Sequence, residues 1–314
     1  MSRDHGPWRP VTAAALAWTP EGNPHSLSFG DIYYSRDNGL EESRYLFLAG
    51  NGLPGRWANW PHRRFCIGET GFGTGLNFLL TWQAWRAATG SRPDLHYLSV
   101  EKYPLSEADL ARAAANWPEL EPLARALLQR YPGLIPGQHR LLLDGGRVTL
   151  DLWWEDVGDA MSDLAGRGEG LVDAWYLDGF APARNEAMWQ PQVLEAVAAL
   201  SRPGATFSTF TAAGRVRRQL AGAGFEVNKV AGHGCKRECL RGTLQRPAAT
   251  TSPSGDMSWD LSHCSPAPPG QAIVLGAGLA GCAAAWSLAR RGVAVTLLEQ
   301  GKLAAAGSGN DQGI

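Results

Sequence analysis

The sequence predicts an α/β protein with a mainly parallel sheet that closes in a C-terminal antiparallel pair, followed by a second, incomplete β-α-β unit. Two observations carry this prediction. Residues 65–245 alternate strand-like and helix-like segments, as expected when helices connect parallel strands. Glycine-rich turns, at 71–75 and 276–281, each follow an apolar strand and open into a helix.

Four regions follow from composition. The expected divisions are an N-terminal extension that packs on the next domain (1–64), the main α/β domain (65–245), a linker (246–270) and the β-α-β fragment (271–314). The extension is rich in Gly, Pro and aromatic residues and mixes short strand-like runs with turns. The linker is dominated by Pro, Ser, Thr and Ala and shows no apolar period.

The elements of the main domain are expected in a regular order. Strands are predicted at "RFCIGE" (64–69), "LHYLSVEKY" (95–103), "VTLDLWWED" (148–156), "DAWYLDGFAP" (173–182) and "ATFSTF" (205–210). Helices are predicted at "LNFLLTWQAWRAA", "ADLARAAANW", "LEPLARALLQRY", "PQVLEAVAALS" and "RVRRQLAGAG". The segments "FEVNKV" and "CLRGTL" are candidates for the closing antiparallel pair.

Composition excludes several function classes. The 314 residues carry a formal net charge of −1, so no global basic excess indicates a nucleic-acid partner, although a local patch is sufficient for one. The five scattered cysteines indicate neither a disulfide framework nor a zinc site, and no metal is expected. No signal peptide or membrane-spanning run is visible. We therefore expect a cytoplasmic protein, away from membranes, with a monomer favoured.

The first glycine turn predicts a cofactor. In "FCIGETGFGTGLNFLL", Gly71, Gly73 and Gly75 alternate between a strand and a helix, where missing side chains let a ligand approach the backbone. The spacing fits neither a Walker A loop nor G-x-G-x-x-G. Glu69 before the turn disfavours a phosphate and favours a cation. S-adenosylmethionine has an ammonium, a sulfonium and no phosphate, so it is the expected cofactor; a plain tight turn is the alternative.

Acids at successive strand ends strengthen this interpretation. Glu101 ends the second strand, where α/β nucleotide-binding sheets hold ribose hydroxyls. Asp156 ends the next strand and is the candidate acceptor from the adenine amino group, with Glu155 competing. Asn77, at the start of the helix after the turn, is assigned to the same cofactor site.

The loop "YLDGFAPARNEAMW" (176–189) contains the candidate catalytic residue, Asp178. If the methyl acceptor is an amine, it must first lose a proton, because alkylammonium pKa values lie near about 10. A carboxylate can orient the amine and accept that proton. In the alternative, Asp178 only caps its own loop.

Two features predict a nucleic-acid substrate. Phe180 and Trp189 are candidates for stacking on a flipped or single-stranded base, although each aromatic residue taken alone is more typical of a core. Residues 202–246 hold nine basic and two acidic residues, and Lys236 and Arg237 stand in the densest part, "GHGCKRECLRG". A polyanion site would need such a segment, and a solvated surface is the alternative.

The motifs together resemble a known family. "SFGDIYYSRDNGLEESRYLFLAGNGLPGRW", "ETGFGTGLNFL", "YLDGFAPARNEAMW" and "GCKRECLRG" resemble the methyltransferase half of the bacterial bifunctional tRNA 5-methylaminomethyl-2-thiouridine biosynthesis family (MnmC type). "AIVLGAGLAGCAAAWSLARRGVAVTLLEQ" and "AAAGSGNDQGI" resemble the start of its FAD-dependent oxidase half. The resemblance implies a Rossmann-like class I methyltransferase fold.

The resemblance also implies a two-step modification of the tRNA wobble uridine. The oxidase half removes a carboxymethyl group, and the methyltransferase half methylates the resulting amine of 5-aminomethyl-(2-thio)uridine with S-adenosylmethionine. The cofactor turn with Glu69 and Glu101 occupies the family's positions, and Asp178 lies in its "DGFAP" loop. The "WWED" segment departs from the family, which more often has Gly before the Asp, so Asp156 is preferred over Glu155.

The second glycine turn belongs to the oxidase resemblance. Gly276, Gly278 and Gly281 form G-x-G-x-x-G, and Glu299 ends the following strand, placed to hold the ribose of FAD. Only two strands are expected here. The sequence therefore predicts a vestigial, truncated FAD unit that binds FAD weakly or not at all, without the oxidase step.

Three other interpretations remain open. In the first, the chain is an FAD- or NAD-dependent oxidoreductase fragment with an N-terminal substrate domain. In the second it is a tRNA-binding module without turnover, and in the third it is a small-molecule amine methyltransferase.

Overall fold

The computed structural model describes residues 10–34, 38–165, 170–234, 237–245 and 270–301. The expected linker lies outside the described residues except for its last residue. The chain divides into two compact units, which are described separately. One comprises residues 1–141 and 150–262, and the other comprises residues 142–149 and 263–314.

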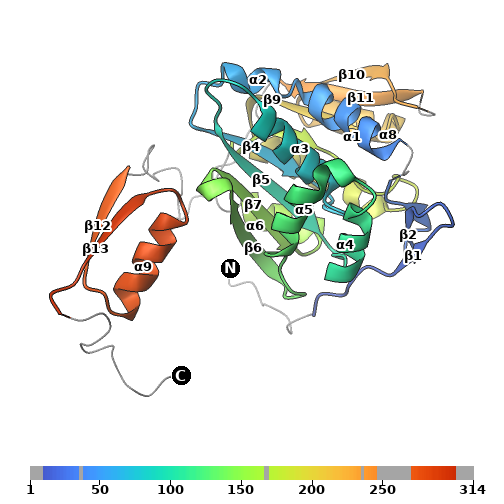
Figure 1. Cartoon of the computed structure of the whole chain (residues 1–314). Helices are drawn as coiled ribbons and strands as arrows, with labels where there is room; N and C mark the ends of the chain where they lie inside the picture. Colours follow the sequence, from blue (N-terminus) through green and yellow to red (C-terminus); the bar gives the residue numbers. More distant parts are fainter. Residues whose placement is uncertain (1–9, 35–37, 166–169, 235–236, 246–269, 302–314) are drawn as a thin grey trace, which may run out of the picture. The chain divides into compact units, whose positions relative to one another are not determined.

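The first unit is built on an eight-stranded sheet with the order β10-β11-β9-β8-β4-β5-β7-β6 (Figure 1). Its strands are β4 (Arg64–Glu69), β5 (Asp94–Glu101), β6 (Gly137–Leu143), β7 (Val148–Trp154), β8 (Val172–Tyr176), β9 (Ser201–Thr209), β10 (Phe225–Ala231) and β11 (Glu238–Leu244). β4 runs parallel to β5 and β8, and β8 runs parallel to β9. β11 runs antiparallel to both β9 and β10. The predicted fold class, including the closing antiparallel pair, is confirmed.

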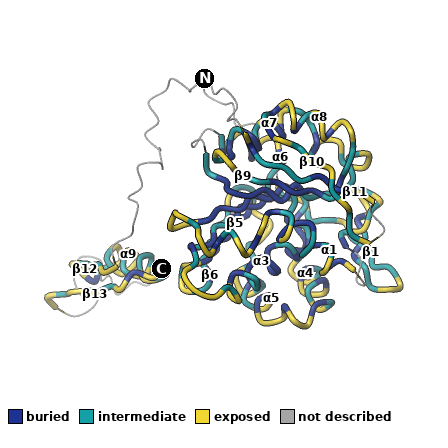
Figure 2. Tube along the Cα trace, turned by 90° about the horizontal axis from the view of Figure 1, so that it is seen from above, coloured by how far each residue is buried: buried dark blue, intermediate teal, exposed yellow. Residues whose placement is uncertain are grey.

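Helices cover both faces of this sheet (Figure 2). One face carries α1 (Gly39–Ser43), α3 (Leu76–Ala87), α4 (Glu107–Ala114) and α5 (Glu121–Leu128), and the other carries α6 (Val157–Ala165), α7 (Pro191–Leu200) and α8 (Gly214–Gly222). Short helical turns are η3 (Pro118–Leu120), η4 (Asp144–Gly146) and η5 (Glu186–Trp189). Because both faces are covered, the central strands are apolar along their length rather than alternating.

Local signals explain where several helices begin. The hydroxyl of Ser106 accepts from the backbone N–H of Asp109 at 3.1 Å and caps α4. Pro191 occupies the first turn of α7, where its missing N–H costs nothing. Strand β6, which includes the segment "QHRLLL", is additional to the predicted elements, although the Pro-Gly pairs at 132–133 and 136–137 are turn signals before it.

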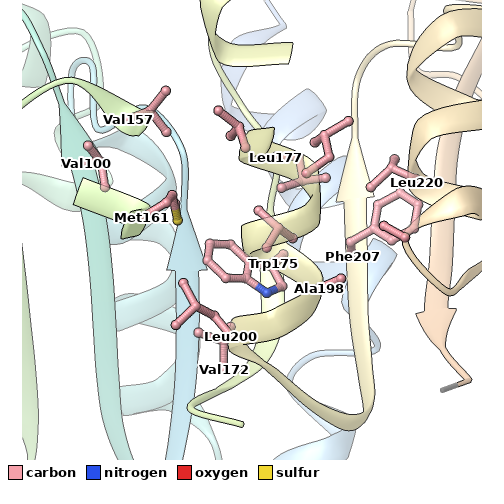
Figure 3. Packing of buried hydrophobic residues seen from close by; sticks show 14 of the residues in the cluster. Val100, Val157, Met161, Val172, Trp175, Leu177, Ala198, Leu200, Phe207 and Leu220 are labelled. Carbon is pink, nitrogen blue, oxygen red and sulfur yellow. The ribbon is translucent and has the colours of Figure 1, made fainter. Parts of the chain in front are cut away.

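The main core lies between the sheet and the α6–α8 layer (Figure 3). Trp175 of β8 is fully buried, and its indole N–H donates to the hydroxyl of Ser201 at 2.8 Å. Gly68 of β4 makes room for that ring, since a Cβ there would lie 2.5 Å from the nearest Trp175 carbon. The glycine in "FCIGE" therefore serves packing, whereas those after it serve the turn.

The N-terminal region contains more helix than the sequence predicts. Its strands are β1 (Leu16–Trp18), β2 (Pro24–Ser26) and β3 (Asp31–Ile32), which form a three-stranded sheet. They are followed by α1, the π-helix η1 (Arg44–Leu48), the 3-10 turn η2 (Ala49–Asn51) and α2 (Gly55–Ala58). Leu46 and Phe47 of η1 are buried. Burial of these apolar side chains on the main sheet, which local pattern does not reveal, stabilises the helical run.

Residues 270–301 of the second unit form a β-α-β motif. β12 (Gln271–Leu275) and β13 (Ala294–Leu298) pair in parallel, and α9 (Leu279–Ala289) connects them. Ile273 and Leu275 on the sheet and Trp286 on the helix are exposed. Across the described part of the chain, no helix has both the length and the apolar character needed to cross a membrane.

Candidate active site

A cavity of about 740 Å³ opens at the carboxyl ends of the central strands of the first unit. The chain leaves β4 toward β5 on one side and later returns to β8 on the other, which creates the crevice where α/β sheets bind ligands. Its acidic lining residues are Asp31, Glu42, Glu101, Glu155, Asp156 and Asp178. Such a lining suits a cationic ligand better than a phosphate.

The first glycine turn forms one wall of this cavity. Gly73 and Gly75 have φ values of +51° and +71°, a region that favours glycine, and Gly75 is the N-cap of α3. A Cβ at Gly71 would lie 3.3 Å from the Met188 methyl and 3.5 Å from the backbone oxygen of Asp178. The missing side chains therefore let the turn lie close against the loop after β8.

Glu101 is held at the end of β5 by backbone donors. Its Oε2 accepts from the N–H of Gly73 at 2.9 Å, and its Oε1 accepts from the N–H of Tyr103 at 2.8 Å. Burial raises its pKa, while these hydrogen bonds favour the charged form. Each carboxylate oxygen keeps a lone pair directed elsewhere. The structure thus places Glu101 in the cavity with acceptor capacity for a diol.

Asp178 also lines the cavity, two residues after the end of β8. Its Oδ1 accepts from the N–H of Gly179 at 2.8 Å, and its Oδ2 accepts from the amide of Asn77 at 2.7 Å. The hydroxyl of Thr70 donates to its backbone oxygen at 2.7 Å. The loop cap suggested as the alternative is present, and the same carboxylate lines the cavity.

Glu69 does not line the cavity, contrary to the expectation that it would face a cation there. It is fully buried beneath the turn and accepts from Ser99 at 2.7 Å and from Asn77 at 2.9 Å. Burial raises its pKa to about 8, against the opposite effect of the Ser99 hydrogen bond. At neutral pH its carboxyl group is therefore largely protonated.

Replacing Glu69 with Gln is expected to flatten the pH dependence of stability. The folded-state pKa of about 8 lies above the ordinary 4.5, so the folded state binds more protons than the unfolded state between these values. The free energy of unfolding then falls as pH rises through this interval, by an amount on the order of a few kcal/mol. Glu69→Gln should lose this slope and match the unaltered chain at acid pH.

Urea denaturation at a series of pH values measures this effect. The exposed Glu107, at the start of α4, offers the control Glu107→Gln, which should keep the slope of the unaltered chain. An unchanged slope in Glu69→Gln would show that Glu69 is ionised in the folded protein.

An aromatic wall closes the side of the cavity near Asp178. Phe180 stacks on Phe29 with ring centroids 4.6 Å apart and contacts Tyr33 edge-on at 5.0 Å. The sequence indicated Phe180 but not its two partners from the N-terminal region. The only signal for them was the aromatic content of residues 1–64, which were expected to pack on the domain.

Trp189 does not fit its predicted role in stacking on a base. Its side chain is buried and outside the cavity lining, and its indole N–H donates to the backbone oxygen of Phe180 at 3.1 Å. It packs edge-on against Phe210. Trp189 therefore packs in the core and supports the Phe180 loop through this hydrogen bond. Burial in the core is the more common position of a tryptophan.

Asp156 and Glu155 both line the cavity. Asp156 accepts from the ammonium of Lys102 at 2.9 Å and from the N–H of Gly158 at 3.0 Å. The backbone N–H of Glu155 donates to the backbone oxygen of Glu101 at 3.1 Å, which ties the ends of β5 and β7 together.

Part of the charge of the basic segment is paired. Among its described residues, ion pairs join Arg202 to Asp173, Arg215 to Glu186 and Lys229 to Glu238. Arg241 donates to the backbone oxygen of Tyr45 and lies over its ring. Arg217, Arg218 and Arg237 are exposed, and Lys236 lies outside the described residues. In the part of the chain that the structure describes, no group of three or more potential metal ligands is present.

The glycine turn of the second unit is built like the first glycine turn. Gly276 has a φ of +95°, and a Cβ at Gly281 would lie 1.8 Å from the Gly276 oxygen, so strand and helix meet there only through glycine. Gly278 is the N-cap of α9. Glu299 accepts from the N–H of Ala277 at 2.7 Å, as Glu101 does from Gly73. These residues fit the first βαβ part of a dinucleotide site.

Two segments match known families. Residues 118–245 match the family described as S-adenosyl-L-methionine-dependent methyltransferase, and residues 271–314 match the FAD dependent oxidoreductase family. The first match includes Asp178 but not the glycine turn or Glu101.

Curated relatives match nearly the whole chain. The tRNA 5-methylaminomethyl-2-thiouridine biosynthesis bifunctional protein MnmC of Chromobacterium violaceum is 50% identical over 96% of this chain and 45% of its own length. The protein of the same name from Stutzerimonas stutzeri is 48% identical over 99% of this chain and 46% of its own. The chain therefore spans about half the length of the curated relatives it matches.

A solved structure supports the fold. The structure described as MNMC2 from Aquifex aeolicus has a TM-score of 0.58 and 21% identity, covering 77% of this chain and 74% of that one. Over the part of their length that it matches, the chain is thus similar to the bifunctional MnmC proteins, and its own segment that matches methyltransferases is followed by one that matches FAD dependent oxidoreductases.

Proposed function

We propose that the chain is an S-adenosylmethionine-dependent tRNA methyltransferase that N-methylates 5-aminomethyl-(2-thio)uridine at the wobble position. The observation that carries this proposal is the placement of Asp178 in an acid-lined cavity, beside the glycine turn to which Glu101 is hydrogen-bonded. The names of the relatives support a tRNA substrate and this base.

The residues present fit S-adenosylmethionine. The glycine turn lines the cavity where the amino acid part could lie, Glu101 can accept from the ribose hydroxyls, and Asp156 can accept from the adenine amino group. The cavity's carboxylates offset a positive ligand charge. The bound cofactor would supply an electrophilic methyl group.

The chain's own residues would then prepare the acceptor. A primary alkylammonium cannot act as a nucleophile until it loses a proton. Asp178, fixed by Gly179 and Asn77, would orient the amine and accept that proton. The wall of Phe29, Tyr33 and Phe180 would stack on the base and exclude water, so that the acceptor is aligned for in-line displacement.

The experiment that tests this function uses labelled S-adenosylmethionine and tRNA that carries the aminomethyl base, followed by nucleoside analysis. We expect label in 5-methylaminomethyl-(2-thio)uridine. Transfer should weaken as salt concentration rises, and Arg217→Ala with Arg218→Ala should reduce the slope of log affinity against log salt by about 1 to 2. Transfer to small amines but not to tRNA would instead establish a small-molecule methyltransferase.

For the FAD segment, the proposal covers only the first part of a cofactor site. The β12-α9-β13 unit supplies the first part of an FAD site through Gly276, Gly281 and Glu299. The absorbance spectrum of the purified protein tests whether this unit binds flavin.

A further inference from the structure

Asn77 stands at the centre of a hydrogen-bond chain that joins four elements. The hydroxyl of Ser43, the last residue of α1, donates to its Oδ1. Its Nδ2 donates to Oε1 of Glu69 at 2.9 Å and to Oδ2 of Asp178 at 2.7 Å. These elements are α1, α3, β4 and the loop after β8.

The partners determine which way the amide points. Both hydrogens of Nδ2 are used on carboxyl oxygens, and Oδ1 is used by a hydroxyl. A rotated amide would put its own oxygen against the carboxylate oxygen of Asp178, with no hydrogen between them. Ser43 reinforces the observed orientation.

The end of this hydrogen-bond chain that lies away from Asp178 is anchored in the core. Glu69 is held by Ser99 of β5 as well as by Asn77. The hydroxyl of Thr81 donates to the backbone oxygen of Asn77 at 2.7 Å, one turn along α3. Asn77 is therefore held by the sheet and by its own helix. Its hydrogen bond to Asp178 is the one that leads to the cavity.

From this arrangement we propose that Asn77 is a positioning residue for methyl transfer, which holds the carboxylate of Asp178 in the orientation that receives the acceptor amine. This inference rests on the proposed function, in which Asp178 takes the proton. It differs from the sequence-based expectation, in which Asn77 binds the cofactor. A cofactor contact and a positioning contact make different kinetic predictions.

Loss of Asn77 should therefore act on kcat rather than on the KM for S-adenosylmethionine. In Asn77→Ala, Asp178 loses its Oδ2 donor, and misplacement of a reacting group lowers kcat by about 10- to 100-fold. The KM for the cofactor should change less than about 3-fold, because the residues assigned to the cofactor are unaltered. Ser43→Ala should lower kcat in the same direction by less, since only the amide orientation is loosened.

Asn77→Asp adds a readout that a structural role would not produce. Three carboxyl groups would then share the site, and the introduced carboxyl group, when protonated, could still donate to Asp178, as the amide does. The ratio of kcat in this variant to kcat in the unaltered chain should rise as pH falls from about 8 to about 6. Burial raises the pKa values of the nearby Tyr97 and Tyr176 and keeps both neutral. The cavity that Asn77 lines also carries Asp31, Glu42, Glu101, Lys102, Glu155, Asp156 and His233.

The matched control is Asn59→Asp, at an exposed position after α2, which should keep both kinetic constants. An unaltered chain that methylates the tRNA, combined with an Asn77→Ala variant whose KM rises at constant kcat, would overturn the positioning role and leave the proposed function standing. An unaltered chain that binds S-adenosylmethionine but transfers no methyl group to this tRNA would overturn the proposed function, and the inference with it.

Discussion

Asp178→Ala is expected to lower the rate of methyl transfer to the aminomethyl tRNA by about 10² to 10⁴-fold, while S-adenosylmethionine still binds. Hydrogen bonds from the Asn77 amide and the Gly179 N–H hold this carboxylate, which lines the cavity. Without it, solvent must remove the amine proton. The residual rate should therefore rise with pH toward the pKa of the amine, near about 10.

Single-turnover transfer of labelled methyl, with cofactor affinity measured by calorimetry, separates these effects. Glu195→Ala removes one carboxylate from an exposed position on α7 and should leave the rate unchanged. A rate in Asp178→Ala within a few-fold of that in the unaltered chain would show that another group handles the proton.

Glu101→Ala is expected to weaken S-adenosylmethionine binding by about 10- to 100-fold, because hydrogen bonds to a charged group contribute roughly 1.5 to 3 kcal/mol. Two effects add. The ribose loses its acceptor, and the N–H groups of Gly73 and Tyr103 lose the carboxylate that holds the glycine turn in place. At saturating cofactor, kcat should largely recover, which distinguishes this residue from Asp178.

Calorimetry with S-adenosylmethionine and with its demethylated product measures the loss directly. The exposed Glu107, six residues along the chain, provides the control Glu107→Ala. Equal affinity in Glu101→Ala and the control would mean that the ribose is held elsewhere.

Several features could be predicted because local chain direction fixes them. The turn at Gly71–Gly75 follows a buried strand, and Glu101 ends the next one, so parallel pairing of β4 with β5 brings them to the same edge of the sheet. Asp178 follows β8, which pairs with β4 on the other side. Recognising the alternation of strands and helices is therefore enough to predict that these strand ends lie together.

Other residues could not be assigned from pattern. Trp189 and Phe180 stand in one loop, yet Trp189 is buried and Phe180 lines the cavity. Two cations of the basic segment are paired with acids that come from other parts of the chain, Asp173 and Glu186. Exposure and pairing depend on the neighbours that folding supplies.

The sequence by itself determined the alternation of strands and helices, the two glycine turns and the acids at the strand ends, because these features depend on the backbone and on neighbours along the chain. Only the tertiary structure decided that Glu69 lies beneath the cavity, that Asn77 meets Asp178 across 101 positions, and that Phe29 stacks on Phe180. The physical reason is that side-chain direction, burial and long-range hydrogen bonds are set by the packing of distant segments, which no local period encodes.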